Sequence, residues 1–207
     1  MKFIGDVHGK FTAYEKLIRA HKDTIQVGDM GVGFFKIEPD GSVKAHRNPP
    51  CDKMVASNAR FIRGNHDNPN VCKRHTQWIP DGHLEDGMMF IGGGISIDKA
   101  YRYEGLDYWC NEELNMFEFQ PIVKKYFDAK PEIMVTHDCP EWVLPIMGHR
   151  LFKLDEPSLT RRTFAFMHQG HKPKLWVFGH WHKSFDKAVG GTRFVCLAEL
   201  EMKDLDL

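Results

Sequence analysis

Phe61-Ile62-Arg63-Gly64-Asn65-His66-Asp67 is the stretch of sequence that decides how the rest of the chain is interpreted. Its apolar start predicts a buried strand, and the glycine ends that strand in a polar loop. The strand end carries an amide, an imidazole and a carboxylate, which a hydrophobic core does not require. In α/β proteins, ligands usually bind at the edge of a sheet where strands end. The stretch therefore predicts a functional site.

Similar polar groups follow other short apolar runs of the sequence. Each run is about four residues long, the length expected of a buried strand. If these strands lie parallel in one sheet, their carboxyl ends crowd one edge and the side chains converge. The groups at these strand ends are Asp6 and His8, Asp29, Asn65 and His66, His137, and His180 and His182.

The order of the expected elements indicates an α/β protein. Strand, helix and strand with carboxylates at the strand ends is typical of the βαβ unit. Gly190-Gly191 predicts a hairpin within residues 185–200, and residues 30–58 indicate a hairpin or a long surface loop. Strands are expected at residues 2–4, 25–27, 61–63, 89–91, 133–135 and 175–178, and helices from residue 12, at 112–127 (which Pro121 could divide) and at 158–169.

Composition favours one globular domain over residues 1–207, because the chain is long enough for one core and nothing requires two. Lys+Arg and Asp+Glu number 28 each, so no overall charge favours nucleic acid or anionic membranes. The apolar runs are too short to span a bilayer, and the N-terminal residues lack a signal-peptide pattern. We therefore expect a cytoplasmic location, no membrane association and no obligate protein partner. The five scattered cysteines argue against a disulfide framework or a structural zinc site.

The collected strand-end groups predict metal ions. They are too many for one tetrahedral zinc ion, which takes four ligands. They suit two metal ions roughly 3.5–4 Å apart that share a bridging carboxylate, an arrangement used for phosphoryl chemistry. Nitrogen and oxygen donors without a thiolate indicate divalent ions such as manganese, iron, zinc or nickel.

Five blocks of the sequence, in order, resemble the signature of the calcineurin-like metallophosphoesterase family. The resemblance implies an α/β fold of the αββα sandwich type, with two mixed β-sheets flanked by helices and a dimetal site at the C-terminal ends of strands. Residues 94–98, Trp109 and Glu112-Glu113 further resemble small bacterial and phage-type members. The five blocks are Gly5-Asp6-Val7-His8-Gly9, Gly28-Asp29, Gly64-Asn65-His66-Asp67, His137 and Gly179-His180-Trp181-His182.

The same resemblance assigns roles to these residues. His66 matches the catalytic histidine of the family, which protonates the leaving oxygen or steadies the phosphate. Two divalent metal ions are implied, with manganese expected and iron, zinc, nickel or magnesium as alternatives. By this resemblance Asp6, His8 and His182 hold the first ion, Asn65, His137 and His180 hold the second, and Asp29 bridges both.

The implied function is hydrolysis of a phosphomonoester or phosphodiester by in-line attack of a metal-bridging hydroxide. A phosphodiester or nucleotide-type substrate is favoured, with a nucleotide or nucleic acid end as candidates. A serine/threonine protein phosphatase is one alternative, although those enzymes have Asp-Arg-Gly where Met30-Gly31-Val32 follows Asp29 here. A non-catalytic metal-bound scaffold is another. Arg63 could contact phosphate or pair with Asp67.

Overall fold

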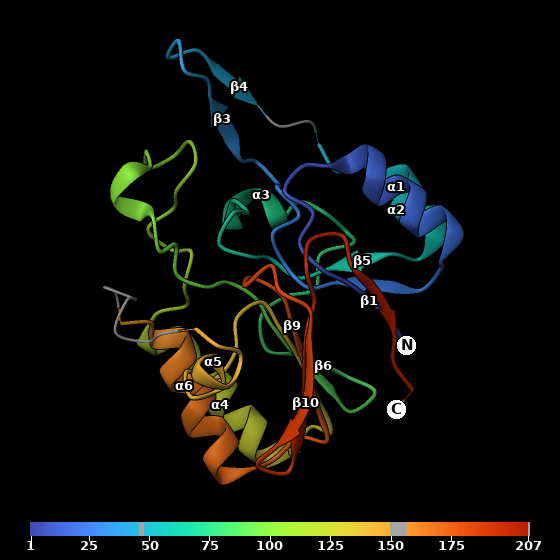
Figure 1. The fold of residues 1–207 in the computed structure, drawn as a ribbon, viewed down its shortest axis with the longest axis vertical. Helices are drawn as coiled ribbons and strands as arrows, with labels where there is room; N and C mark the ends of the chain where they lie inside the picture. The colour runs from blue at the N-terminus through green and yellow to red at the C-terminus, as the bar shows by residue number, and fades with distance from the viewer. Residues whose placement is uncertain (46–47, 150–156, 207) are drawn as a thin grey trace.

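Two β-sheets lie face to face at the centre of the molecule, and helices cover their outer faces (Figure 1). This computed structural model describes residues 1–45, 48–149 and 157–206. The expected αββα sandwich of two mixed sheets is confirmed.

The four-stranded sheet carries the first three of the polar strand ends. Its order is β12-β1-β2-β5, and β12 (Met202–Asp204) runs antiparallel to β1. The other pairs are parallel, so β1 (Lys2–Ile4), β2 (Thr24–Gln26) and β5 (Arg60–Phe61) all end at the same edge.

The six-stranded sheet carries the other two polar strand ends. Its four central strands are parallel, and an antiparallel strand lies at each edge. The Gly190-Gly191 turn joins β10 and β11, so the predicted hairpin is confirmed. In spatial order the strands are β10 (Phe185–Val189), β11 (Thr192–Cys196), β9 (Leu175–Phe178), β8 (Ile133–Thr136), β7 (Met88–Ile91) and β6 (His83–Glu85).

The separation into two sheets corrects one expectation. The strands before the polar groups do not lie in one sheet, because β8 and β9 belong to the six-stranded sheet and β1, β2 and β5 to the other. The site is therefore assembled where the carboxyl ends of both sheets meet.

Alternating side chains along the strands build three hydrophobic layers. In β9, Leu175 and Val177 face the other sheet, while Trp176 and Phe178 face the helices. A third layer lies between the four-stranded sheet and α1. Successive side chains of a strand point to opposite faces of the sheet. A strand that is buried on both faces therefore appears in the sequence as a continuous apolar run.

The helices flank the sheets as Figure 1 shows, with α1 and α2 on one side and α4, α5 and α6 on the other. Asn115 and Glu118 form a capping box at the start of α4, and the helix continues through Pro121, so Pro121 does not divide it. No helix in the described residues is long and apolar enough to cross a membrane. The helices are α1 (Phe11–Ala20), α2 (Cys51–Ser57), α3 (Pro69–Cys72), α4 (Met116–Ala129), α5 (Val143–Ile146) and α6 (Leu159–Gly170), with a short 3₁₀ helix η1 (Lys99–Tyr101).

The segment expected as a hairpin or loop, residues 30–58, contains both a hairpin and a helix. Strands β3 (Phe35–Ile37) and β4 (Val43–Ala45) pair antiparallel and project from the body of the molecule (Figure 1). Helix α2 follows, and the sequence analysis did not predict a helix within this segment. Residues 46 and 47 of this segment lie outside the described residues.

Candidate active site

The predicted side chains meet at the edge where strands of both sheets end. Loops after β1, β2 and β5 bring them from the four-stranded sheet, and loops after β8 and β9 bring them from the six-stranded sheet. All eight residues that the sequence singled out lie in this one region: Asp6, His8, Asp29, Asn65, His66, His137, His180 and His182.

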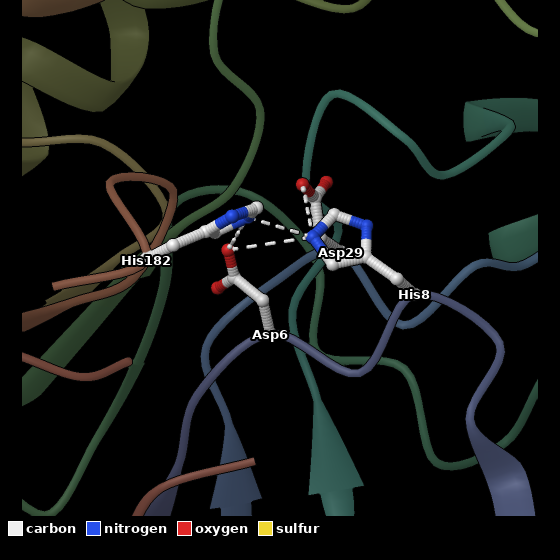
Figure 2. A group of neighbouring side chains, drawn as sticks. All are labelled: Asp6, His8, Asp29 and His182. Carbon is white, nitrogen blue, oxygen red and sulfur yellow. Dashed lines mark hydrogen bonds and ion pairs between the residues drawn. The ribbon is translucent and has the colours of Figure 1, made fainter. Parts of the chain in front are cut away.

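One group of four side chains points toward a common centre, as Figure 2 shows for Asp6, His8, Asp29 and His182. One ligand atom from each lies within 4.8 Å of the others. Nε2 of His182 is 3.0 Å from Oδ2 of Asp6, and Nε2 of His8 is 3.7 Å from Oδ2 of Asp29. The carboxylates are buried, whereas the side chain of His182 is half exposed. This group therefore lies on the solvent side of the site.

A second group lies deeper and consists of Asp29, His137 and His180. Nε2 of His137 is 3.3 Å from Oδ1 of Asp29 and 3.2 Å from Nδ1 of His180. Oδ1 of Asn65 lies 3.0 Å from the same Nε2 atom and adds an oxygen donor. Asp29 belongs to both groups, with Oδ2 toward His8 and Oδ1 toward His137. Its carboxylate is therefore placed to bridge two ions.

Hydrogen bonds around the groups fix how the rings and carboxylates are turned. Nδ1 of His137 donates to the carbonyl of Val27 at 2.9 Å, which leaves Nε2 to face the site. The backbone N–H of His180 donates to both oxygens of Asp6 at 3.1 Å. The backbone N–H of His66 donates to Oδ1 of Asp29 at 2.8 Å. Each carboxylate is therefore held by backbone from a neighbouring strand end.

Four of these residues have backbone conformations that side-chain-bearing residues rarely adopt. The φ angles are 47° for His8, 58° for Asp29, 66° for His180 and 49° for His182. Left-handed conformations at non-glycine residues cost on the order of 1–3 kcal/mol each and cluster at functional sites. Their occurrence at four proposed ligands indicates that the loops are shaped by ligand placement.

Asp67 holds two of these loops together, a role that the sequence analysis did not assign. Its buried carboxylate accepts the backbone N–H groups of Gly31 and Val32 at 2.7 and 2.8 Å and of Gly64 at 2.7 Å. The loop after Asp29 is thereby fixed to the loop that carries Asn65. The sequence signal was its place directly after His66.

Arg63 does not reach the site. Its buried guanidinium pairs with Asp81, with Nε 2.8 Å from Oδ2, and donates to the carbonyl of Glu112 at 2.7 Å. Both sequence alternatives, a phosphate contact and a pair with Asp67, are therefore wrong. Arg63 instead stabilises the segment that carries Glu112.

The electrostatics of the two groups favour cations. Burial alone would raise the pKa of Asp29, but the neighbouring imidazoles of His137, His66 and His8 hold it well below its usual value. Burial would lower the pKa of His137, yet the Asp29 carboxylate raises it. The site thus stabilises a negative carboxylate next to a positive charge.

The residues present fit two divalent ions, on the chemistry of the donors and on their spacing. Nε2 of His8 lies 2.8 Å from Nε2 of His182, and Nε2 of His137 faces oxygen atoms of both Asn65 and Asp29. One proton cannot serve all of these lone pairs, whereas a cation can bind several at once. Nitrogen and oxygen donors without thiolate suit borderline divalent metals.

Glycines before the ligands leave room for side chains from neighbouring strand ends. A Cβ atom on Gly64 would overlap the carboxylate of Asp29, one on Gly28 would overlap the His137 ring, and one on Gly179 would overlap Asp6. The glycine at the start of the Gly-Asp, Gly-Asn-His and Gly-His motifs is therefore required for steric reasons.

A Gly64→Ala variant is expected to lose metal affinity, because its methyl group displaces Asp29 from both groups. Overpacking of this kind costs about 1–3 kcal/mol. Gly94→Ala is the matched control, since a Cβ there would meet His137 and His180 only at ordinary contact distances of 3.5 and 3.6 Å. Bound manganese per chain, measured by equilibrium dialysis, checks the prediction. Equal metal binding by the two alanine variants would contradict it.

A cavity of about 450 Å³ opens over the two groups and is lined by Asp29, His66 and His180. A larger cavity of about 590 Å³ lies elsewhere, around Met1, Arg60 and Glu85, and contains none of the predicted site residues. The strand-end pattern marked the first of these cavities, but of its outer wall only Trp181 lies in a strand-end block. That outer wall consists of Ser96, Ile97, Asp98, Arg102, His149 and Trp181.

Comparison with known proteins agrees with this geometry. Residues 2–184 match the model of the calcineurin-like phosphoesterase family. No sequence among the curated proteins matches the chain. A solved structure of GAP50, the anchor in the inner membrane complex of Plasmodium, is similar with a TM-score of 0.51 and 9% identity, covering 96% of this chain and 71% of that one.

A second solved structure, a putative 5'-nucleotidase from Staphylococcus aureus in complex with alpha-ketoglutarate, has a TM-score of 0.50 and 12% identity. The match covers 96% of this chain and 48% of the nucleotidase, so this chain spans about half of that protein. At such identities the two likenesses show the fold alone.

An αββα sandwich with two clusters of potential metal ligands at its strand ends, matched by the family model, defines a metal-dependent phosphoesterase, a hydrolase acting on phosphoester bonds. The chain belongs to the calcineurin-like phosphoesterase family.

Proposed function

We propose that this protein is a dimetal phosphoesterase that favours a phosphodiester or nucleotide-type substrate. The observation that carries the proposal is the position of Asp29, whose two oxygens face two separate ligand groups. His66 lies beside it, with Nε2 3.9 Å from Oδ2 of Asp29. A substrate phosphate held at both groups would therefore also meet His66.

The proposed ligands divide as the family resemblance implies. Asp6, His8 and His182 would hold the first ion, and Asn65, His137 and His180 the second, with Asp29 shared. When bound, two divalent ions lower the pKa of water toward about 7 and neutralise charge on phosphate oxygens. The buried carboxylates and imidazoles orient the site for in-line attack at phosphorus, because they are fixed before substrate arrives.

His66 is the proposed catalytic residue. Burial lowers its pKa to about 4, although the Asp29 carboxylate opposes the shift and the Arg102 guanidinium adds to it. The free ring is therefore neutral at pH 7, with one N–H group to donate. A bound anionic phosphate would raise the pKa of His66, so either sequence-based role, protonating the leaving oxygen or steadying the phosphate, fits this position.

The outer wall of the cavity supports the diester preference. Arg102 is a cationic residue of this wall, and its guanidinium pairs with both carboxylate oxygens of Asp98. Nε lies 2.6 Å from Oδ1, and Nη2 lies 2.7 Å from Oδ2. The positive charge there is balanced, so the wall offers little net attraction for the additional negative charge that a monoester carries. Ile97 and Trp181 add apolar surface. An uncharged second ester substituent therefore suits this wall.

The test is hydrolysis of bis(p-nitrophenyl) phosphate beside p-nitrophenyl phosphate, after chelation and re-addition of manganese. We expect no turnover after chelation, recovery with manganese, and faster hydrolysis of the diester. Faster hydrolysis of the monoester would contradict the diester preference. Absence of turnover with manganese, iron, zinc, nickel or magnesium in a folded protein would favour the scaffold alternative.

A serine/threonine protein phosphatase remains the weaker candidate. The loop that would carry the Asp-Arg-Gly motif is occupied by Met30-Gly31-Val32, whose N–H groups bond to Asp67. Faster turnover of a phosphoserine peptide than of the diester would favour the protein phosphatase alternative. The single domain over residues 1–207, the cytoplasmic location, the manganese preference and the lack of an obligate protein partner stay predictions from the sequence.

A further inference from the structure

We propose that Ser96 and Glu112 are positioning residues that set which atom of the Asn65 side chain faces the second metal ion. The proposal rests on the proposed metal site and adds a hydrogen-bonded chain behind it. Glu112 belongs to neither cluster of potential metal ligands.

The network consists of two hydrogen bonds between side chains and one from a backbone N–H, all among residues that are nearly inaccessible to solvent. Nδ2 of Asn65 donates to Oγ of Ser96 at 3.0 Å, and Oγ of Ser96 donates to Oε2 of Glu112 at 2.5 Å. The backbone N–H of Ser96 also donates to Oε1 of Glu112 at 2.9 Å. The exposed fraction of each residue is 3% or less, so water does not compete for these bonds.

The direction of the donors decides the orientation of the amide. A carboxylate only accepts, so with Glu112 ionised the Ser96 hydroxyl must point its proton at Glu112. The lone pairs of Ser96 are then left for Asn65, which can satisfy them only with its NH₂ group. Oδ1 of Asn65 consequently faces Nε2 of His137, 3.0 Å away, where an oxygen ligand is needed. With the amide reversed, an N–H group would point at the metal.

Glu112 is itself held in place from the other side. Arg63 donates to the backbone carbonyl of Glu112 at 2.7 Å while its Nε bonds to Asp81. The N–H of Gly93 donates to the carbonyl of Arg63 at 2.8 Å, which joins the two loops. The backbone beside the Glu112 carboxyl is therefore fixed. Burial raises the pKa of this carboxyl to about 7 against the hydrogen bonds from Ser96, so it acts purely as an acceptor above that pH. Groups that orient a metal ligand from behind typically contribute about 10–100-fold in metal affinity.

The test is a calorimetric titration of metal-free protein with manganese above pH 7, where Glu112 is ionised, comparing wild type with Glu112→Gln and Ser96→Ala. In Glu112→Gln, the glutamine NH₂ group can donate to Ser96, so the hydroxyl proton is freed. We expect the affinity for one ion to fall on the order of 10–100-fold in both variants, while the other ion binds as in wild type. Ser96→Thr keeps the hydroxyl and is expected to retain wild-type affinity.

Glu113→Gln is the matched control. Glu113 is the neighbouring carboxylate, but it accepts from Ser158 and from the N–H of Thr160 at the start of α6. This control is expected to bind both ions normally, with any loss confined to the melting temperature.

Three results would overturn the inference. Two ions bound with wild-type affinity in both Glu112→Gln and Ser96→Ala would exclude an orienting role. Equal weakening of both ions would indicate general structural damage instead. A wild-type protein that binds fewer than two ions would overturn the proposed site itself, and this inference with it.

Discussion

Replacing Asp29 with asparagine is expected to remove binding of both ions and to lower turnover by roughly 10³-fold or more. Loss of a single electrostatic stabiliser already costs about 10²–10³ in rate, and Asp29 serves two ion sites at once. The amide oxygen of asparagine can still accept the N–H of His66, so the loop should stay folded. Metal content by elemental analysis and diester hydrolysis check the prediction.

Asp67→Asn separates ligand loss from structural damage. Asp67 is equally buried, but its oxygens accept only backbone N–H groups of the two adjoining loops. We expect this variant to melt at a lower temperature and yet to bind two ions per folded chain. Retention of two ions by Asp29→Asn would exclude Asp29 as the bridging ligand. Equal metal loss in both variants would contradict the expected difference and show that metal binding depends on the loops that Asp67 holds.

His66→Ala is expected to reduce turnover by about 10²–10⁴-fold, the usual contribution of a general acid or base. The loss should depend on the leaving group if His66 protonates the leaving oxygen. A p-nitrophenolate leaves readily without a proton, so its ester should be affected less than an alkyl ester of the same phosphate. Measuring kcat for both esters in wild type and variant checks this, while metal content should be unchanged.

An equal loss for both esters would assign His66 to steadying the phosphate and not to proton transfer. His21→Ala serves as the control, since His21 lies at the end of α1 and outside the described site. Unchanged turnover of both esters in His66→Ala would exclude His66 from catalysis.

The proposed ligands could be found from sequence because each follows a short buried strand. Residues such as Asp6, Asp29 and His137 stand directly after apolar runs, and ends of parallel strands lie at one edge. The steric need for Gly28, Gly64 and Gly179 explains why the pattern is so regular.

Other features depend on contacts that no local pattern encodes. Phe178 and Ile4 both precede site loops, yet only tertiary packing places them in different sheets. The partner of Arg63 is Asp81, which lies 18 positions away. The edge strands β6 and β12 are not fully buried and mix polar with apolar residues, so neither gives a continuous apolar run.

The location of the site between the two sheets has a consequence for the stability of the whole molecule. Each proposed ion would have ligands from both sheets, and would therefore link one sheet to the other. The four-stranded sheet supplies Asp6 and Asn65, and the six-stranded sheet supplies His182 and His137. A ligand that binds only the folded state stabilises it by about 2.7 kcal/mol when its concentration is 100 times its dissociation constant. The melting temperature of the protein would then rise with the concentration of free metal. Removal of the ions would weaken the contact between the two sheets at the edge that carries the proposed site.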